Sequence, residues 1–374
     1  MSYNTLEMNI LLVTATYYPT VNGVSFYIKT LKKELEKNGH KVFVLAPSFP
    51  GFKDMEKNII RYPSLPNPLV KRYPLGVPIV LMSKLQKLKI DVVHVQHPLV
   101  IGKFAVSAAE KLGITLFFTA HTNYEQYLNY YFPKGYFLAS KFILNDIKNL
   151  ATKCQTVICP SSETQTRLKN HGVKNTTLML NSVDTEVFSP IKKPKSEIFR
   201  IIYVGRIEKE KNPLFLIDIA RELKKRKFKF EMLIVGTGNL WAKLSQRISK
   251  LKLEDEVKLG GEVPNQVLPI LYNSADIFFT PSTSEVMPIT ILESLACGVP
   301  VGVLKNSNLE SIITNNLNGI VVPNKVGAVA EEIIKLASDK KLLNKMSKNA
   351  RLEALKHSVT TYARDLIKIY KADN

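Results

Sequence analysis

Short apolar runs alternate with amphipathic segments along most of the chain. The run Ile10–Ala15 has the length of a buried strand, and in the next segment, Phe26–Lys37, apolar residues recur with the period of a helix. Further strands are predicted at Lys41–Ala46, Val92–Val95, Thr115–Ala120, Thr156–Pro160, Arg200–Gly205, Phe230–Val235, Val257–Leu259 and Ile277–Thr280, and further helices at Lys103–Leu112, Pro213–Lys227 and Trp241–Leu251. This alternation predicts parallel sheets that helices cover on both faces.

A polar stretch with two prolines, Ser189–Ile198, interrupts the alternation before it starts again at Arg200. Such a segment is typical of an interdomain linker. The 374 residues are enough for two or three domains. The sequence therefore predicts an α/β protein with two doubly wound domains and a boundary at residue 190.

The chain is strongly basic, with 52 Lys and Arg against 32 Asp and Glu and a net charge of +20. Residues 1–190 and 191–374 share the excess equally, and a field of this sign attracts phosphates, nucleic acid or an anionic membrane. The three cysteines form no CxxC pair, which fits a reducing, cytoplasmic compartment. We expect no signal peptide and no transmembrane helix, because no apolar run is long enough, so any membrane contact is expected to be peripheral.

The first candidate for chemistry is the loop Gly205–Pro213, which follows a predicted strand. Parallel sheets bind ligands beyond the carboxyl ends of their strands. Gly205 allows close backbone approach, and Arg206 and Lys211 supply cations, so the loop could bind a diphosphate. The alternative is an ordinary solvated basic turn.

The second candidate follows the strand Ile277–Thr280 and contains Glu285 and Glu293. Their spacing of eight residues corresponds to about two helical turns, so both side chains can lie along one face. The alternative is a pair of solvated glutamates, but the otherwise apolar segment around them argues against it.

The sequence resembles the family-4 retaining glycosyltransferases, which have the GT-B fold. The motifs that carry the resemblance are the E-x7-E pair Glu285 and Glu293, Ala296–Val301, Gly205-Arg206 with Lys211, Asn318-Gly319, the glycine loop Pro19–Val24, Asn38–Val42 and Val183–Pro190. Each is weak alone, whereas their order and spacing over nearly the whole chain are specific.

The resemblance implies two Rossmann-like domains that face a central cleft. Residues 1–190 would bind the acceptor, residues 191–355 the nucleotide sugar, and residues 356–374 would form a helix that packs back on the first domain. In this family the basic pair Arg206 and Lys211 neutralises the departing diphosphate, while fixed cations accelerate such a step electrostatically.

The resemblance also implies the remaining donor contacts. Glu293 would hold the ribose hydroxyls and Glu285 would face the donor sugar. The other donor-binding residues would be Gly23, Gly205, Gly236, Glu262, Met287, Pro288 and Ile289. Relatives usually have Phe-Gly or Gln-Gly where this chain has Met287-Pro288, and proline donates no backbone N–H, so a donor contact made there by relatives would be lost or moved.

His121 follows a buried-type strand and matches a family histidine that contacts the donor sugar, although a lone histidine is more often structural. The pattern around it is most similar to the bacterial diacylglycerol glucosyltransferases. That similarity implies a lipid acceptor, with Tyr124, Tyr127, Tyr130, Tyr131, Lys71 and Arg72 at the acceptor or membrane side.

A run of six basic residues without an acid supports a membrane surface for this enzyme: Arg61, Lys71, Arg72, Lys84, Lys87 and Lys89. With the nearby tyrosines, such a run would attract anionic lipid at about 1 kcal/mol per cation. The alternative is that the aromatic residues belong to the core and that the lysines only lie on the solvent-exposed faces of helices.

The combined prediction is a retaining enzyme that transfers glucose from UDP-glucose to a lipid such as diacylglycerol at the inner face of the cell membrane. Retention would follow a same-face mechanism in which a diphosphate oxygen helps to deprotonate the acceptor. Because no Asp-x-Asp occurs, we expect no metal and no cofactor. The alternatives are an inositol phosphate, thiol-precursor or polysaccharide acceptor, or a GT-B nucleotide-sugar epimerase; no nucleic-acid recognition motif is evident.

Overall fold

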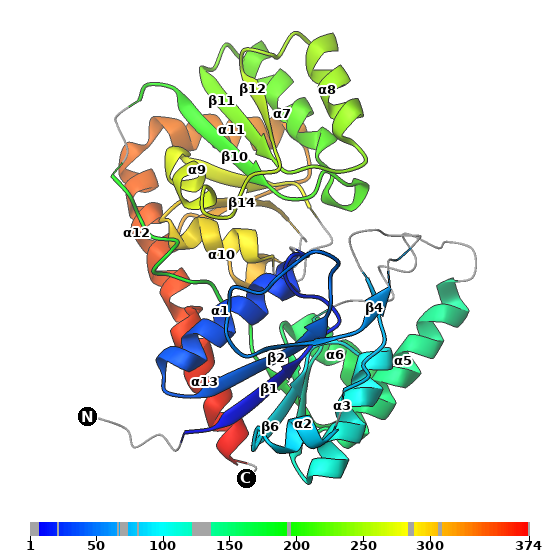
Figure 1. Ribbon diagram of the computed structural model, residues 1–374. Coiled ribbons are helices and arrows are strands. Elements are labelled where there is room, and N and C mark those ends of the chain that lie inside the picture. The colour runs from blue at the N-terminus through cyan, green and yellow to red at the C-terminus, as the bar shows by residue number, and fades with distance from the viewer. Residues whose placement is uncertain are drawn as a thin grey trace. The chain divides into compact units, whose positions relative to one another are not determined.

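Two parallel sheets form the framework of the protein (Figure 1). The computed structural model describes residues 7–20, 22–65, 67, 74–80, 82–121, 136–192, 196–282, 288–305 and 309–372. Unit 1 comprises Met1–Leu180 and Val359–Asn374, and unit 2 comprises Asn181–Ser358. The prediction of two doubly wound α/β domains is confirmed.

The sheet of unit 1 has seven parallel strands in the order β3-β2-β1-β6-β7-β8-β9. They are β1 (Asn9–Val13), β2 (Lys41–Pro47), β3 (Ile59–Tyr62), β6 (Val92–Val95), β7 (Thr115–Thr119), β8 (Thr156–Cys159) and β9 (Thr176–Leu178). A separate antiparallel pair consists of β4 (Ser64–Leu65) and β5 (Leu75–Gly76). The helices are α1 (Gly23–Lys37), α2 (Met82–Gln86), α3 (Leu99–Leu112), α5 (Tyr136–Lys153), α6 (Ser162–Asn170) and α13 (Val359–Ala372).

Burial on both faces explains why the strands of unit 1 are continuous apolar runs. In β1, Ile10 and Leu12 pack into a core that α1 and α13 cover. Leu11 and Val13, which point the other way, pack into a second core under α2, α3 and α5. Because successive side chains of a strand alternate between the two faces of the sheet, the side chains on both faces of each strand must be apolar.

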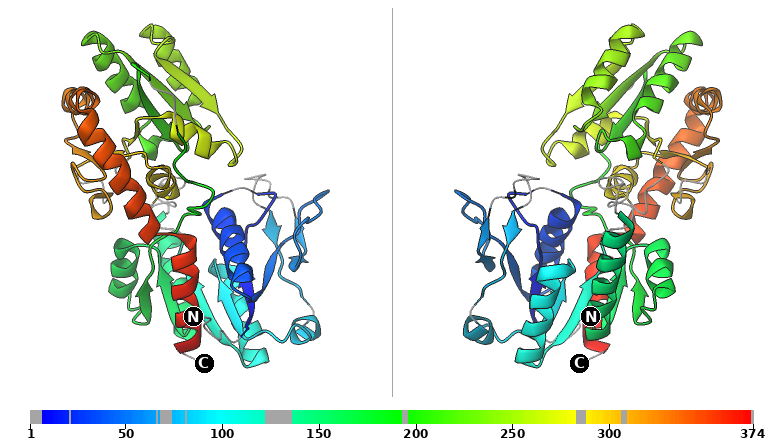
Figure 2. Two further views of the ribbon diagram at one scale, coloured as in Figure 1. Left: turned by 90° about the vertical axis from the view of Figure 1, so that its left-hand side faces the viewer. Right: turned by 90° about the vertical axis from the view of Figure 1, so that its right-hand side faces the viewer.

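Helix α1 begins at Gly23 because the residue before it forms a capping box. The Asn22 side chain accepts from Ser25 N, and the Ser25 hydroxyl accepts from Asn22 N, each at 2.9 Å. Helix α13 then runs alongside α1, as Figures 1 and 2 show in red and blue. Two buried hydrogen bonds fix α13: the hydroxyls of Tyr27 and Tyr362 lie 2.9 Å apart, and Tyr370 OH lies 2.6 Å from His94 Nδ1.

The sheet of unit 2 has six parallel strands in the order β12-β11-β10-β13-β14-β15. They are β10 (Phe199–Val204), β11 (Phe230–Val235), β12 (Val257–Gly261), β13 (Ile277–Thr280), β14 (Val301–Leu304) and β15 (Gly319–Val322). The helices are α7 (Leu214–Lys225), α8 (Trp241–Lys250), α9 (Leu268–Ser274), α10 (Ile289–Ala296), α11 (Val326–Ser338) and α12 (Lys340–Lys356), with short 3-10 turns at Lys209–Lys211 and Leu309–Ser311.

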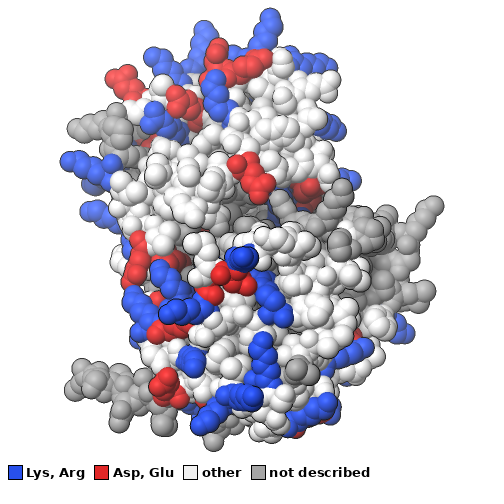
Figure 3. All heavy atoms as spheres, in the orientation of Figure 1, with Lys and Arg blue, Asp and Glu red and all other residues white. Residues whose placement is uncertain are grey.

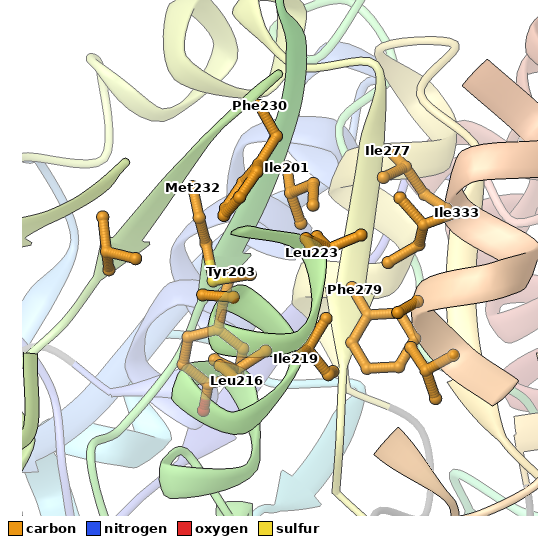
Figure 4. Packing of buried hydrophobic residues seen from close by; sticks show 14 of the residues in the cluster. Ile201, Tyr203, Leu216, Ile219, Leu223, Phe230, Met232, Ile277, Phe279 and Ile333 are labelled. Carbon is orange, nitrogen blue, oxygen red and sulfur yellow. The ribbon is translucent and has the colours of Figure 1, made fainter. Parts of the chain in front are cut away.

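One core of unit 2 lies between this sheet and α7, α8 and α11 (Figure 4). Leu216, Ile219 and Leu223 of α7 point toward side chains of β10, β11 and β13. On β13, Ile277 and Phe279 enter this core, whereas Phe278 points the other way and packs against Tyr272 of α9, with ring centroids 6.0 Å apart. The central strands β10 and β13 are therefore covered from both sides.

The boundary between the two units lies after Leu180, ten residues before the boundary that the prolines predict. Residues 181–190 belong to unit 2 because Arg351 of α12 donates to Thr185 O and Phe188 O at 3.0 and 2.9 Å. Val183 N also donates to His357 O at 3.0 Å. These contacts hold the segment before the polar linker on unit 2, and the chain returns to unit 1 at Val359 rather than at residue 356.

Loss of the Tyr370 hydroxyl should destabilise unit 1. His94 and Tyr370 are both fully buried, so Tyr370→Phe leaves an imidazole nitrogen without its partner. We expect the free energy of unfolding to fall by about 1–3 kcal/mol, measured as the midpoint of urea unfolding by circular dichroism. The control is Tyr18→Phe, at a half-buried ring whose hydroxyl bonds to none of the described residues. Equal midpoints for the two variants would contradict the prediction.

Candidate active site

The strand order of unit 2 defines a position for a ligand. Neighbours β10 and β13 lie at the centre of the sheet, and the chain leaves them toward opposite edges, which is the topological switch point where open α/β sheets bind ligands. Gly205 and Arg206 follow β10 directly, and Ser282 follows β13. The hydroxyl of Ser282 lies 3.4 Å from Glu210 O, so the two loops meet at this edge.

The predicted glycines of this edge pack against each other. Gly205 N donates to Val235 O at 3.0 Å, and Gly236, with φ +127°, lies so close that an added Cβ would overlap Gly205 O. An added Cβ at Gly238 would overlap Ile207 O in the same way. Glycine is required here because two loop backbones are in direct contact.

The two predicted cations lie in the loop after β10. Arg206 is exposed and forms an ion pair with Glu210 at 2.8 Å, while Lys211 ends the short 3-10 turn and is half-buried. The buried Glu208, which the sequence analysis missed, anchors this turn: its carboxylate accepts from the backbone N–H and the side-chain amide of Asn239, at 3.0 and 3.2 Å. The loops after β10 and β11 are therefore bonded to each other, and the two cations lie at their edge.

Glu293 lies in the second turn of α10, which begins at Ile289 after Pro288. Its side chain is buried, with 5% exposed, and Oε2 accepts a hydrogen bond of 2.8 Å from the Tyr272 hydroxyl. Burial raises the pKa of Glu293 to about 7, and the hydrogen bond from Tyr272 acts in the opposite direction. The partner Tyr272 comes from α9, and no sequence motif pointed to it.

Of the other predicted donor residues of unit 2, some are described and some lie outside the described residues. Glu262 is exposed and follows β12. Glu285 and Met287 lie outside the described residues, so only the second carboxylate of the E-x7-E pair has a known environment. Pro288 is extended, with φ −70° and ψ 133°, and no side chain caps the helix after it.

In unit 1, Gly23 and His121 lie near the carboxyl ends of β1 and β7. His121 Nε2 lies 2.7 Å from Gln96 Oε1, and the Tyr27 ring packs edge-on against the imidazole at 4.8 Å. Burial lowers the pKa of His121 well below its usual value, and the neighbouring His97 and His94 act in the same direction. His121 is therefore a neutral group at pH 7.

Of the basic run predicted for the membrane side, the structure describes the environment of Arg61 and the backbone of Lys89. Arg61 is held by the Asp54 carboxylate at 2.6 and 2.9 Å, and its guanidinium also donates to Tyr18 O and Pro47 O. The backbone of Lys89 lies at the amino edge of the sheet, where Asn9 donates to its carbonyl at 2.7 Å. Arg61, one of the six basic residues expected to attract anionic lipid, therefore has its guanidinium bound within its own domain.

Lys71, Arg72, Tyr124, Tyr127, Tyr130 and Tyr131 lie outside the described residues. On the face drawn in Figure 3, acidic side chains lie among the basic ones on both units. Within the described ranges, no helix is both long and apolar enough to cross a membrane. The same residues contain no cluster of three or more His, Cys, Asp or Glu side chains that could hold a metal ion.

Two protein-family models match the chain, and together they cover residues 21–353. A model described as Glycosyltransferase Family 4 matches residues 21–187, and one described as Glycosyl transferases group 1 matches residues 184–353. The chain belongs to the family-4 glycosyltransferases. The resemblance that the sequence motifs suggested is thereby confirmed, and the edge of unit 2 that carries Gly205, Arg206 and Lys211 lies within the second matched region.

Two curated relatives are similar over most of their length. The alpha-monoglucosyldiacylglycerol synthase of Acholeplasma laidlawii is 27% identical, covering 97% of this chain and 96% of its own. The enzyme of the same name from Streptococcus pneumoniae is 28% identical, covering 87% and 78%. A GDP-mannose-dependent alpha-mannosyltransferase of Corynebacterium glutamicum is 27% identical over 84% of this chain and 76% of its own.

Solved structures share the fold. Anabaena HepE, solved with UDP and glucose, has a TM-score of 0.74 at 18% identity and covers 98% of this chain and 100% of its own. Sucrose-phosphate synthase of Thermosynechococcus elongatus has a TM-score of 0.75 at 17% identity, with 98% and 99% covered. The predicted GT-B fold is confirmed.

The raised pKa of Glu293 predicts a pH-dependent gain in stability for Glu293→Gln. In the folded protein the Glu293 carboxyl keeps its proton up to pH about 7, whereas the ordinary pKa of a glutamate is 4.5. The free energy of unfolding of the wild type therefore falls as the pH rises from 4.5 to 7. At pH 8 the variant avoids the buried charge and should be more stable by on the order of 2–3 kcal/mol. The difference should shrink at pH 5.5, where Glu293 is protonated.

Thermal unfolding over a pH series measures this effect. The matched control is Glu331→Gln, an exposed carboxylate of α11 that should show no such pH-dependent gain. A constant difference between wild type and Glu293→Gln from pH 5.5 to 8 would contradict the raised pKa.

Proposed function

We propose that this glycosyltransferase transfers glucose from UDP-glucose to a diacylglycerol-type lipid, with retention of the anomeric configuration and without a metal. The observation that carries the proposal is the placement of Gly205, Arg206 and Lys211 beside β13 at the switch point of unit 2. The similarity to two enzymes named alpha-monoglucosyldiacylglycerol synthase supports the choice of sugar and acceptor.

Unit 2 has the groups that a nucleotide diphosphate requires. Arg206 and Lys211 are fixed cations at the loop after β10, where charge that develops on the leaving diphosphate is stabilised without reorganisation. The Glu293 carboxylate has one oxygen bonded to Tyr272, and Oε1 is then the acceptor for a ribose hydroxyl. The backbone contact of Gly205 with Gly236 holds this loop in place.

The proposed chemistry needs no protein nucleophile. The bond between the anomeric carbon and the phosphate oxygen breaks, the acceptor oxygen attacks from the same face, and its proton passes to the departing diphosphate. The cations stabilise the negative charge, and the positive charge on the anomeric carbon is neutralised by the incoming hydroxyl oxygen. The neutral His121 of unit 1 contributes a hydrogen bond to a substrate hydroxyl and no proton transfer.

We also propose that the enzyme is peripheral at the inner face of the cell membrane. Support comes from unit 1, where the segment around the β4–β5 pair exposes four apolar side chains: Leu65, Leu75, Val77 and Ile79. A surface cluster of this kind is typical of sites that contact lipid or protein. The exposed Lys84 and Lys87 of the same unit add attraction to anionic headgroups.

Substitution of Lys211 should impair the chemical step. We expect Lys211→Ala to lower kcat by roughly 10- to 100-fold, because a charge-assisted bond to the leaving group is lost. The assay uses UDP-glucose and dioleoylglycerol in mixed micelles, with the product identified by mass and its anomeric configuration by NMR. Lys209→Ala is the matched control, since Lys209 is exposed in the same turn and should retain activity.

The same assay with a panel of nucleotide sugars measures the specificity for the donor. Transfer from GDP-mannose instead of UDP-glucose, an inverted product or loss of activity with chelator would each overturn one part of the proposal. Equal activity of Lys211→Ala and Lys209→Ala would remove Lys211 from the site.

Removal of the exposed leucines should weaken membrane binding. We expect the double variant Leu65→Ser and Leu75→Ser to bind liposomes at least tenfold more weakly, because two leucines lose burial in lipid. Sedimentation with phosphatidylcholine vesicles, with and without phosphatidylglycerol, measures the binding. The control is Leu352→Ser with Leu355→Ser on α12, which are exposed to a similar extent in unit 2; equal losses in both pairs would argue against the β4–β5 segment.

A further inference from the structure

Arg351 of α12 binds three backbone carbonyls within unit 2. Its Nη1 donates to Ala296 O at 2.8 Å and to Phe188 O at 2.9 Å, and its Nη2 donates to Thr185 O at 3.0 Å. The guanidinium is planar, always charged and has five N–H donors, so one side chain can hold carbonyls of separate segments together. Arg351 therefore connects the segment before the polar linker with the end of α10, the helix that carries Glu293.

The carbonyl of Ala296 belongs to the last turn of α10. A helix leaves its last four carbonyls without an intrahelical partner. In α10 the residues that follow satisfy three of them, through Cys297 N, Gly298 N and Val299 N at 3.0, 2.9 and 2.9 Å. The fourth, Ala296 O, belongs to a buried residue and accepts from Arg351. A positive group also suits this end of a helix, where the partial charge is negative.

The position of α10 depends on this end. The helix has only eight residues, and among the described residues no side chain caps its start. Ser347, one turn before Arg351 on α12, donates to Gly298 O at 2.6 Å, so α12 bonds to α10 and to the turn after it. Because Glu293 lies three residues before Ala296, the direction of its side chain follows from how this end is held.

A second set of contacts leads from Arg351 to Glu293 through aromatic rings. Phe188, whose carbonyl Arg351 binds, is buried, and its ring packs edge-on against the Tyr272 ring with centroids 6.1 Å apart. Phe278 of β13 contacts the same ring at 6.0 Å. Tyr272 is thus packed against two phenylalanines, and its hydroxyl donates to Glu293 Oε2 at 2.8 Å. Close packing of this kind limits how far the hydroxyl can move from the carboxylate.

We propose that Arg351 is a positioning residue for the nucleotide sugar. Its bond to Ala296 O fixes α10, and its bond to Phe188 O fixes the ring that packs on Tyr272. Both contacts direct Glu293 Oε1 toward the ribose, so Arg351 acts on donor binding without touching the substrate. The inference rests on the proposed function, in which Oε1 accepts from a ribose hydroxyl.

Titration calorimetry with UDP and with 2′,3′-dideoxy-UDP separates this role from a purely structural one. The ratio of the two dissociation constants measures what the ribose hydroxyls contribute. We expect a ratio of roughly 10- to 100-fold for the wild type, because the dideoxy analogue loses a hydrogen bond to a charged acceptor. Arg351→Met should lower the ratio to less than about threefold while binding of dideoxy-UDP changes little, because that hydrogen bond is lost.

The matched control is Arg226→Met. Arg226 is exposed in the same unit and also donates to a backbone carbonyl, Gly327 O at 3.2 Å, but that carbonyl belongs to α11. This variant should keep the wild-type ratio. A wild-type ratio in Arg351→Met, or equal weakening of UDP and dideoxy-UDP, would overturn the proposal.

Phe188→Leu makes the same test without removing a charge, and it replaces Arg351→Met if thermal unfolding shows that Arg351→Met does not fold. Loss of the aromatic ring leaves Tyr272 less tightly packed, so the ratio should fall below that of the wild type. A wild-type ratio in folded Phe188→Leu would exclude the contact through Tyr272.

A double-mutant cycle identifies the group through which Arg351 acts. Glu293→Ala removes the carboxylate, so its ratio should be low, and addition of Arg351→Met should not lower it further. A further fall by the factor seen in the wild-type background would show that Arg351 acts on the ribose without Glu293, and the proposal would be wrong.

Hydrogen exchange of the full-length protein without ligand tests the anchoring of α10 alone. We expect amides of α10 to exchange roughly 5- to 10-fold faster in Arg351→Met than in the wild type, because local opening of the helix becomes easier. Arg226→Met should leave them unchanged, and unchanged exchange in Arg351→Met would overturn the anchoring. If α10 exchanges faster but the wild type binds UDP and dideoxy-UDP equally, the ribose role in the proposed function is wrong and the anchoring by Arg351 is supported.

Discussion

Burial of both faces of two parallel sheets is the constraint on which the rest of this structure depends. Helices cover the strands on both sides, so a ligand can approach the strands only at their ends. His121, Arg206 and Gly236 all lie just beyond carboxyl ends of strands. The chemistry of the protein is therefore concentrated in short loops whose backbones are held by a rigid sheet.

Desolvation at these edges adjusts the charge of the functional groups. It raises the pKa of the acid Glu293 and lowers the pKa of the bases His97 and His121, because in each case it disfavours the charged form. Arg206, which is exposed, forms an ion pair with Glu210. The same physical effect thus favours neutral imidazoles in unit 1, while the cations of unit 2 stay near solvent.

Hydrogen bonds from residues outside the motifs then orient these groups. Tyr272 fixes one oxygen of Glu293, Gln96 fixes the ring of His121, and Glu208 holds the turn that ends in Lys211. A buried polar group without a partner would cost free energy, so each functional side chain requires such a partner. Mutation of these partners is expected to affect function through geometry rather than through contact with substrate.

The sequence by itself determined the two α/β domains, since the apolar runs and their spacing depend on local periodicity, and it determined the family through the motifs around Gly205 and Glu293. Only the tertiary structure decided that Tyr272 meets Glu293, 21 residues away, and that Gln96 meets His121, 25 residues away. It also decided that Arg61 binds Asp54 and two backbone carbonyls of its own unit. These contacts join separate strands and helices, and no periodicity within one segment encodes which side chain of another segment lies opposite.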